Sequence, residues 1–317
     1  MAPGNHQHDD QHETISVAAS GTAAAPVGRG HSRTTLVVSG VAFVAAAAVA
    51  VAVAVASTTA PSPMAPEHLA AAAQDPTGAA GPAEPVTAPR PVSDAELAAL
   101  PQATTFATVP DAPRDDAPVA VPSGRIVQPR STVPVYVAPG DRAIAVLPAT
   151  QLVSDTSVPV VEERPGWVRV LLPVRPNGST GWLYLDDPRI DLSRTPYRIV
   201  VDRASFTLTL FENDHERQRW KVGVGKPNSV TPTGRTFLLA SIKDTQSSFS
   251  PIILPLGFHS DTYTSYGGGP GTVGIHTWPT PDVYGTASSD GCVRVPPDAL
   301  SVLSGREIPL GTPVLVS

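Results

Sequence analysis

The chain has 317 residues and a net charge of −6 at neutral pH, and it contains 36 Pro and 25 Gly but only 7 Phe, 6 Tyr and 4 Trp. The acidic balance, without any run of basic residues, argues against a nucleic-acid partner. The single cysteine excludes an internal disulfide, a cysteine-rich zinc site and an iron–sulfur cluster.

The N-terminal part predicts a tail and a membrane span. Residues 1–34 are polar and lack periodicity, which indicates a disordered tail on the cytoplasmic side. Residues 36–56 are Val, Ala, Leu and Phe, interrupted only by Ser39 and Gly40. At 1.5 Å per residue this run crosses a bilayer core of about 30 Å, so we predict a transmembrane signal-anchor helix over 35–57. A cleaved signal peptide is the alternative, although signal sequences have shorter apolar regions.

The basic residues around this span predict its orientation. Arg29 and Arg33 precede it, and the next Lys or Arg in the chain is Arg90. By the positive-inside rule the protein is a single-pass protein of the cell membrane, with the C-terminal domains extracytoplasmic. Residues 58–127 are rich in Pro and Ala without apolar periodicity, and they predict a linker. Within it, Ser93 and Glu96 form a capping-box pattern that predicts a short helix ending near Leu100.

Residues 128–194 carry strand signals. Five short runs rich in Val and aromatic residues and bounded by Pro and Gly turns predict strands over 133–137, 143–147, 158–163, 167–172 and 181–185. So many short strands in so few residues favour a small barrel. The segments 135–140, 166–170 and 180–183 resemble a bacterial SH3-like domain. We expect Trp167 and Trp182 in the core or rim of that barrel.

Residues 195–317 form a second β-rich block, which makes the predicted fold class mainly β. The pattern predicts a hairpin from the strands 198–202 and 207–211, followed by further strands over 218–224 and 236–240. One helix is predicted over 297–304, because Pro stands at its start and Gly305 follows its end.

The lone cysteine is the candidate nucleophile of this block. Cys292 follows Gly291, where the backbone can turn tightly and its N–H groups can face a carbonyl oxygen. Arg294 adds a positive charge that favours a thiolate or holds a carboxylate. The base would be His276, which ends a strand, or His259, and spacing alone does not choose between them. Zinc bound by the two histidines and the cysteine is not expected, because no supporting carboxylates stand at a recognisable spacing.

These residues also carry a family resemblance. His276, followed by Ser289 and by Gly-Cys-Val-Arg over 291–294, resembles the active-site signature of the YkuD-type L,D-transpeptidases. Residues 222–225 with 231–234 are similar to a strand–turn segment of that family, and 311–314 to its closing strand. The resemblance covers about residues 197–317. The chain departs from the pattern at Asp290, where many members have His.

The resemblance implies an enzyme that cross-links peptidoglycan without a cofactor. Cys292 would form a thioester with a stem tetrapeptide and pass it to an amine of another stem. His276 would be the general base and acid, the backbone carbonyl of Thr277 would orient it, and the Gly291 N–H would line the oxyanion hole. The residues expected to bind substrate are Arg294, Ser289, His259, Tyr263 and Trp278.

The resemblance further implies that β-lactams of the carbapenem type inhibit the protein. It leaves two alternatives to cross-linking: a carboxypeptidase-type thiol hydrolase of wall peptides, and a wall-binding protein without catalysis.

Overall fold

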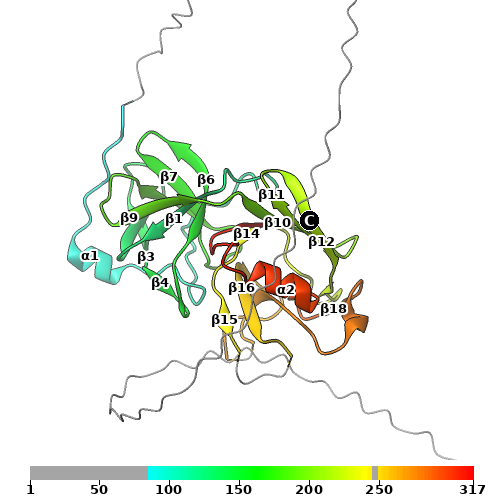
Figure 1. The fold of residues 1–317 in the computed structure, drawn as a ribbon. Coiled ribbons are helices and arrows are strands. Elements are labelled where there is room, and N and C mark those ends of the chain that lie inside the picture. The colour runs from blue at the N-terminus through cyan, green and yellow to red at the C-terminus, as the bar shows by residue number, and fades with distance from the viewer. Residues whose placement is uncertain (1–84, 245–248, 267) are drawn as a thin grey trace, which may run out of the picture. The chain divides into compact units, whose positions relative to one another are not determined.

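The computed structural model describes residues 85–244, 249–266 and 268–317 (Figure 1). The predicted tail, the predicted anchor and the first part of the predicted linker lie outside these residues. None of the helices in the described part of the chain has the length and hydropathy of a membrane span.

The short helix predicted in the linker is present. Helix α1 (Asp94–Ala99) has Ser93 as its N-cap residue. The Glu96 N–H donates to Ser93 Oγ at 3.3 Å, and the Ser93 N–H donates to Glu96 Oε2 at 2.8 Å. The reciprocal pair satisfies two backbone donors that the first turn of a helix cannot use internally.

Within the described residues, seven antiparallel strands follow in one sheet of order β3-β2-β8-β7-β6-β1-β9. They are β1 (Arg125–Pro129), β2 (Val133–Tyr136), β3 (Ala143–Leu147), β6 (Val158–Arg164), β7 (Trp167–Leu171), β8 (Thr180–Tyr184) and β9 (Ile190–Arg194). Strands β4 (Thr150–Gln151) and β5 (Ser154–Asp155) form a separate hairpin. The five predicted strands are confirmed, whereas the polar and largely exposed β9 gave no apolar pattern to detect. The likeness to an SH3-like barrel stays a prediction.

The C-terminal region has two larger sheets and a small one. The first has the order β12-β11-β10-β20-β14 and the second the order β15-β16-β17-β19. Their strands are β10 (Tyr197–Asp202), β11 (Thr207–Glu212), β12 (His215–Lys221), β14 (Gly234–Phe237), β15 (Ile242–Lys243), β16 (Ile252–His259), β17 (Thr272–His276), β19 (Val293–Arg294) and β20 (Pro313–Val316). Strand β13 (Val224–Gly225) pairs with β18 (Ala287–Ser289). The mainly β class and the predicted hairpin are confirmed.

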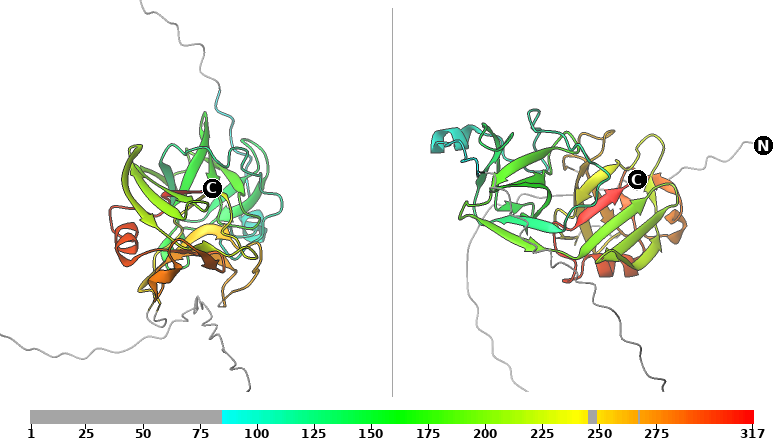
Figure 2. Two further views of the ribbon diagram at one scale, coloured as in Figure 1. Left: turned by 90° about the vertical axis from the view of Figure 1, so that its right-hand side faces the viewer. Right: turned by 90° about the horizontal axis from the view of Figure 1, so that it is seen from above.

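Two helical elements complete this region. The 3₁₀ turn η1 (Pro281–Val283) precedes β18, and α2 (Pro297–Leu303) confirms the predicted helix. Ala299, Leu300 and Leu303 of α2 are buried in the apolar cluster that β10, β11, β16 and β17 also enter. In Figure 2, α1 lies beside the green N-terminal sheet and α2 beside the C-terminal sheets.

A second apolar cluster joins the seven-stranded sheet to the C-terminal region. It contains the valines of β2, β6 and β7 together with Phe237 and Leu239, both fully buried. Phe237 is the last residue of β14, and Leu239 follows that strand, so this part of the C-terminal region contributes two side chains to the core of the preceding sheet. The apolar surface that the two sheets share holds them together.

Residues 101–120, which we call the strap, differ from the linker predicted over 58–127. Ala103, Thr105, Val109 and Ala112 in the strap are buried. Its backbone forms isolated bridges with β3 and with the segment 175–179. Small apolar residues without a helical or strand period gave no sequence signal, although they pack closely here. The other predicted domain boundaries stay predictions.

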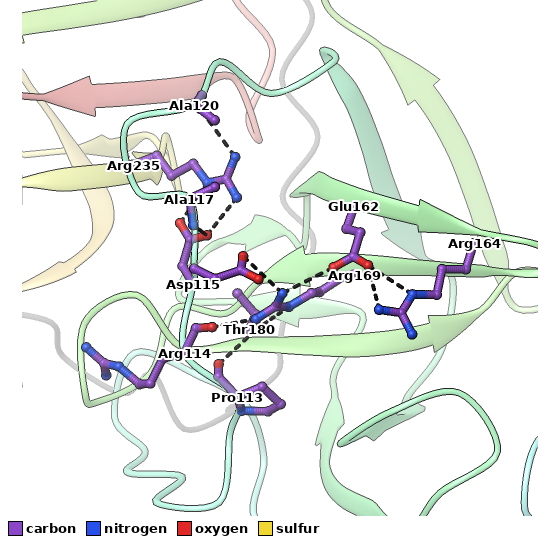
Figure 3. Close-up of polar contacts among 11 residues, drawn as sticks. Pro113, Arg114, Asp115, Ala117, Ala120, Glu162, Arg164, Arg169, Thr180 and Arg235 are labelled. Carbon is purple, nitrogen blue, oxygen red and sulfur yellow. Dashed lines mark hydrogen bonds and ion pairs between the residues drawn. The ribbon is translucent and has the colours of Figure 1, made fainter.

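Charged side chains fasten the strap on both sides (Figure 3). Asp115, whose side chain is only 3% exposed, accepts two hydrogen bonds from Arg235 of β14, with Nε at 2.7 Å and Nη2 at 2.6 Å. The neighbouring Asp116 forms an ion pair of 3.3 Å with Arg169 of β7. The strap thereby connects the seven-stranded sheet to the C-terminal five-stranded sheet.

Candidate functional site

The register of two parallel strands brings the predicted nucleophile and base to adjoining positions. Ile275 of β17 pairs with Val293 of β19, and His276 pairs with Arg294. Cys292 directly precedes β19, two residues before Arg294. Paired residues of neighbouring strands point to the same face, so His276 and Arg294 share one face of the sheet, next to the loop that carries Cys292.

A backbone carbonyl orients the ring of His276. The ring is 1% exposed, and its Nδ1 lies 2.7 Å from the carbonyl oxygen of Thr277. A carbonyl only accepts, so Nδ1 carries the proton and Nε2 of the neutral ring is the basic nitrogen. Thr277 is itself held, since its N–H donates to Ser250 Oγ at 3.1 Å and its hydroxyl to the Phe249 carbonyl at 2.8 Å. The predicted hydrogen bond between the His276 ring and the backbone carbonyl of Thr277 is present.

Aromatic rings enclose the other sides of this histidine. Phe249 meets His276 edge to face at a centroid distance of 5.1 Å, and Trp278 lies 5.7 Å from Phe249. The guanidinium of Arg294 stacks over the Trp278 ring at 3.8 Å. The structure thus places the predicted substrate residues Arg294 and Trp278 against each other, next to the base. Arg294 is only 7% exposed, and the face of the Trp278 ring gives its guanidinium a favourable cation–π contact.

Ser289 shapes the nucleophile loop, and this corrects two predictions. The Ser289 hydroxyl donates to the carbonyl of Cys292 at 2.6 Å and accepts the N–H of Gly291 at 3.1 Å. We predicted that the Gly291 N–H lines the oxyanion hole, but in this structure it donates to Ser289 inside the loop. Ser289 is fully buried, so its role is to form the turn rather than to bind substrate. The thiol-bearing Cys292 retains 9% exposure.

The turn over residues 225–231 forms hydrogen bonds with the nucleophile loop. The Ser229 hydroxyl donates to the carbonyl of Asp290 at 2.9 Å, and the Thr231 hydroxyl donates to the carbonyl of Gly291 at 2.8 Å. Gly225 permits the close approach, because a Cβ there would lie 2.3 Å from the Ser229 carbonyl oxygen. The sequence indicated the turn, but not its contacts with the nucleophile loop.

Asp290, the departure from the family pattern, is the centre of a polar cluster. Its carboxylate forms an ion pair with Lys226 at 2.6 Å and accepts the hydroxyls of Tyr263 at 3.4 Å and Tyr266 at 3.3 Å. The two tyrosine rings pack at 5.4 Å. Of these partners the sequence singled out only Tyr263. The negative charge at position 290 is thus balanced next to the cysteine.

This geometry lies inside a region that comparison with known proteins identifies. Residues 196–316 match YkuD, the L,D-transpeptidase catalytic domain. The match confirms the resemblance predicted from the Cys292 and His276 motif. No curated protein matches the chain.

Three solved structures illustrate the similarity. An L,D-transpeptidase from Mycobacterium smegmatis has 18% identity and a TM-score of 0.33, covering 50% of this chain and 99% of that one. The catalytic domain of the E. faecium enzyme has 23% identity and a TM-score of 0.31, with coverage of 38% and 96%. An L,D-transpeptidase from Mycobacterium tuberculosis H37Rv has 15% identity and a TM-score of 0.32, with coverage of 45% and 73%.

The connection between β7 and β8 contacts the segment of the YkuD-type domain that contains Tyr263 and Tyr266. We call residues 260–266 and 268–270 the tyrosine loop. Arg175, which follows β7, donates to the carbonyl oxygens of Ser260 and Tyr263, each at 3.1 Å, and of Pro270 at 2.9 Å. One guanidinium thus fixes both ends and the middle of the loop. Nothing in the sequence indicated this long-range contact.

His259, the predicted substrate residue and rival base, lies elsewhere in the YkuD-type domain. It pairs with Thr272, four residues before His276, which is about 13 Å along the strand. The side chain is fully buried, and its Nε2 lies 2.6 Å from the carbonyl of Thr105 in the strap. Burial lowers the pKa of His259 to about 4, against a smaller opposing effect of the Thr105 hydrogen bond. The structure therefore makes it a packing residue, and the prediction of a substrate contact is wrong.

In the described part of the chain, no group of three or more His, Cys, Asp or Glu side chains is placed to hold a metal ion.

Proposed function

We propose that the YkuD-type domain is a cysteine-dependent acyltransferase that cross-links peptidoglycan stem peptides. The observation that carries the proposal is the β17–β19 register, which sets His276 beside the Cys292 loop with its Nδ1 held by Thr277. A thiol beside an imidazole whose tautomer is fixed is the arrangement that cysteine acyl transfer needs. The domain match supplies the substrate class.

In the first half-reaction, Sγ of Cys292 attacks the carbonyl that joins the L-centre of the stem diamino acid to the terminal D-alanine. Nε2 of His276 accepts the thiol proton, and the carbonyl of Thr277 stabilises the resulting imidazolium. The tetrahedral oxyanion would be stabilised by the N–H of Cys292. As the C–N bond breaks, His276 returns the proton to the leaving amine, which departs as D-alanine and leaves a thioester.

In the second half-reaction, an amine of another stem attacks the thioester carbonyl. His276 takes a proton from that amine, the C–S bond breaks and the thiol is restored, so the enzyme is unchanged and one amide bond has replaced another. Trp278 and Arg294 lie next to His276, and Tyr263 contacts Asp290 in the nucleophile loop, so we assign these four residues to stem-peptide binding. Water in place of the amine would make the protein a carboxypeptidase.

The setting we propose is extracytoplasmic. The apolar run over 35–57, with Arg29 and Arg33 before it, supports a single-pass membrane anchor, and peptidoglycan lies on the far side of that membrane. The same thiol would be acylated by the strained carbonyl of a carbapenem-type β-lactam, which makes such compounds expected inhibitors.

Product analysis tests this function. The purified full-length chain in detergent is incubated with a disaccharide-tetrapeptide, and the products are separated and weighed by mass spectrometry. We expect a cross-linked dimer and released D-alanine, with both lost in Cys292→Ser. A tripeptide without dimer would establish the hydrolase instead, and unchanged tetrapeptide would leave a wall-binding protein.

A further inference from the structure

A cluster of aromatic side chains lies on the seven-stranded sheet, apart from its main apolar core. Tyr136 of β2, Trp167 of β7 and Trp182 of β8 form it, and Tyr184 packs against them. The Tyr136 and Trp167 rings meet edge to face at 5.2 Å, and Tyr184 lies 5.2 Å from Trp167. Because β2, β8 and β7 are neighbours in the sheet, these rings make one continuous aromatic surface.

The chain lays its own residues 86–92 along this surface, and we call them the cis segment. Their sequence is Val-Thr-Ala-Pro-Arg-Pro-Val, and they form neither helix nor strand. The indole N–H of Trp167 donates to the carbonyl of Thr87 at 2.8 Å, and the hydroxyl of Tyr136 donates to the carbonyl of Arg90 at 3.3 Å. The two carbonyls are three residues apart, which is one turn of a polyproline II helix.

Two glycines let the cis segment approach the sheet. Gly140 and Gly166 have φ values of +75° and +74°, a conformation that other residues rarely adopt. A Cβ on Gly166 would lie 2.4 Å from a methyl group of Val86, and one on Gly140 would lie 2.6 Å from the methyl group of Thr87. The two glycines therefore leave the space that Val86 and Thr87 of the cis segment occupy against the sheet.

We propose that this aromatic surface is a binding groove for extended, proline-containing peptides, and that the cis segment is its intramolecular ligand. Aromatic grooves whose donors reach backbone carbonyls select polyproline II segments, because proline restricts the free peptide to the bound shape. The groove selects peptides whose carbonyl groups lie three residues apart, because Trp167 and Tyr136 each donate a hydrogen bond to one of them. A partner in trans would carry the same Pro-X-Pro spacing as Pro89 and Pro91.

The groove has room beyond what the cis segment fills. A hollow of about 200 Å³ remains where Pro89 and Pro91 meet Tyr136, Tyr184 and Leu97. A peptide with a larger side chain at this point would bury more surface than the cis segment does. An intramolecular ligand acts at an effective concentration in the millimolar range, so an added peptide binds well only after the cis segment is released.

The test loosens the cis segment without altering the groove. The full-length chain carrying Pro89→Gly and Pro91→Gly gains conformational freedom in the released state, which weakens cis binding about 5–30-fold. We expect a fluorescent peptide of the sequence 86–92 to bind this variant about 5–30-fold more tightly than the unaltered chain, by anisotropy. The indole N–H resonance of Trp167 should shift when the segment is loosened and return when the peptide is added.

Tyr136→Phe in the loosened chain supplies the groove variant, because it removes one hydrogen bond and keeps the ring. It should weaken peptide binding about 3–10-fold, whereas Tyr197→Phe, which removes a hydroxyl from the other region, should not change it. A peptide with both prolines replaced by alanine should bind more weakly. Absence of peptide binding to the loosened chain, or binding that neither Tyr136→Phe nor the alanine peptide changes, would overturn the proposal.

Discussion

The strap offers two adjacent aspartates whose stability contributions should differ sharply. Asp115 forms its bidentate pair with Arg235 at side-chain exposures of 3% and 4%. Asp116 reaches Arg169 at 3.3 Å, but its own side chain is 76% exposed. Water can replace the lost partner only at the second site, so removing Asp115 leaves a buried guanidinium without its counter-charge.

The expected magnitudes follow from this difference in burial. Breaking a buried pair from one side costs about 3–5 kcal/mol, whereas an exposed pair contributes at most about 1 kcal/mol. For a folded region of this size, each kcal/mol shifts the melting temperature by roughly 2–4 °C. Asp115→Ala should therefore lower the melting temperature by roughly 6–20 °C, and Asp116→Ala by no more than about 4 °C.

Differential scanning calorimetry of the full-length chain measures both variants. The double variant Asp115→Ala with Arg235→Met should recover much of the loss, because it removes the uncompensated charge as well as the pair. Equal shifts for Asp115→Ala and Asp116→Ala would refute the reasoning. So would a double variant whose loss equals the sum of the two single losses.

Three further outcomes are expected. Arg175→Met removes three hydrogen bonds to the tyrosine loop and should lower kcat/KM for the stem tetrapeptide about 10–100-fold. Alkylation of Cys292 by iodoacetamide should change less than about 3-fold, and equal losses in both assays would contradict this. The pKa of His259 is about 4 when folded and 6.5 in its ordinary state, so the unfolded chain takes up the proton first as the pH falls. Urea titrations should show stability falling by at most about 3 kcal/mol between pH 6.5 and 4, and His259→Gln should remove that decline; an unchanged decline would count against it. Asp290→Asn removes the counter-charge of Lys226 and should speed alkylation of Cys292 at pH 7 by about 2–5-fold, and a slower rate would argue against the electrostatic role.

The features that the sequence predicted correctly are local in the chain. Valine-rich runs between turn residues identified the five strands β2, β3, β6, β7 and β8, and Ser93 with Glu96 identified α1. The motif around Cys292 predicted the domain that the family match confirms. In each case the information lies within a few consecutive residues, which pattern and propensity can detect.

The features that the sequence did not predict depend on residues far apart in the chain. Asp115 and Arg235 are 120 positions apart, and Lys226 and Asp290 meet across two loops. His259 is buried under the strap, where its Nε2 lies next to the carbonyl of Thr105, 154 positions away in the chain. The use of the Gly291 N–H by the Ser289 hydroxyl depends on a side-chain rotamer that no spacing rule specifies.

The central claim is that Cys292 carries the acyl group and that His276, not His259, activates it. The most direct measurement is the intact mass of the full-length chain, quenched in acid at short times after mixing with the stem tetrapeptide. We expect a tripeptide acyl adduct on Cys292 that forms about 10²–10⁴-fold more slowly in His276→Ala and at the normal rate in folded His259→Ala. An adduct that still forms in Cys292→Ser, or that forms at the normal rate in His276→Ala, would contradict it.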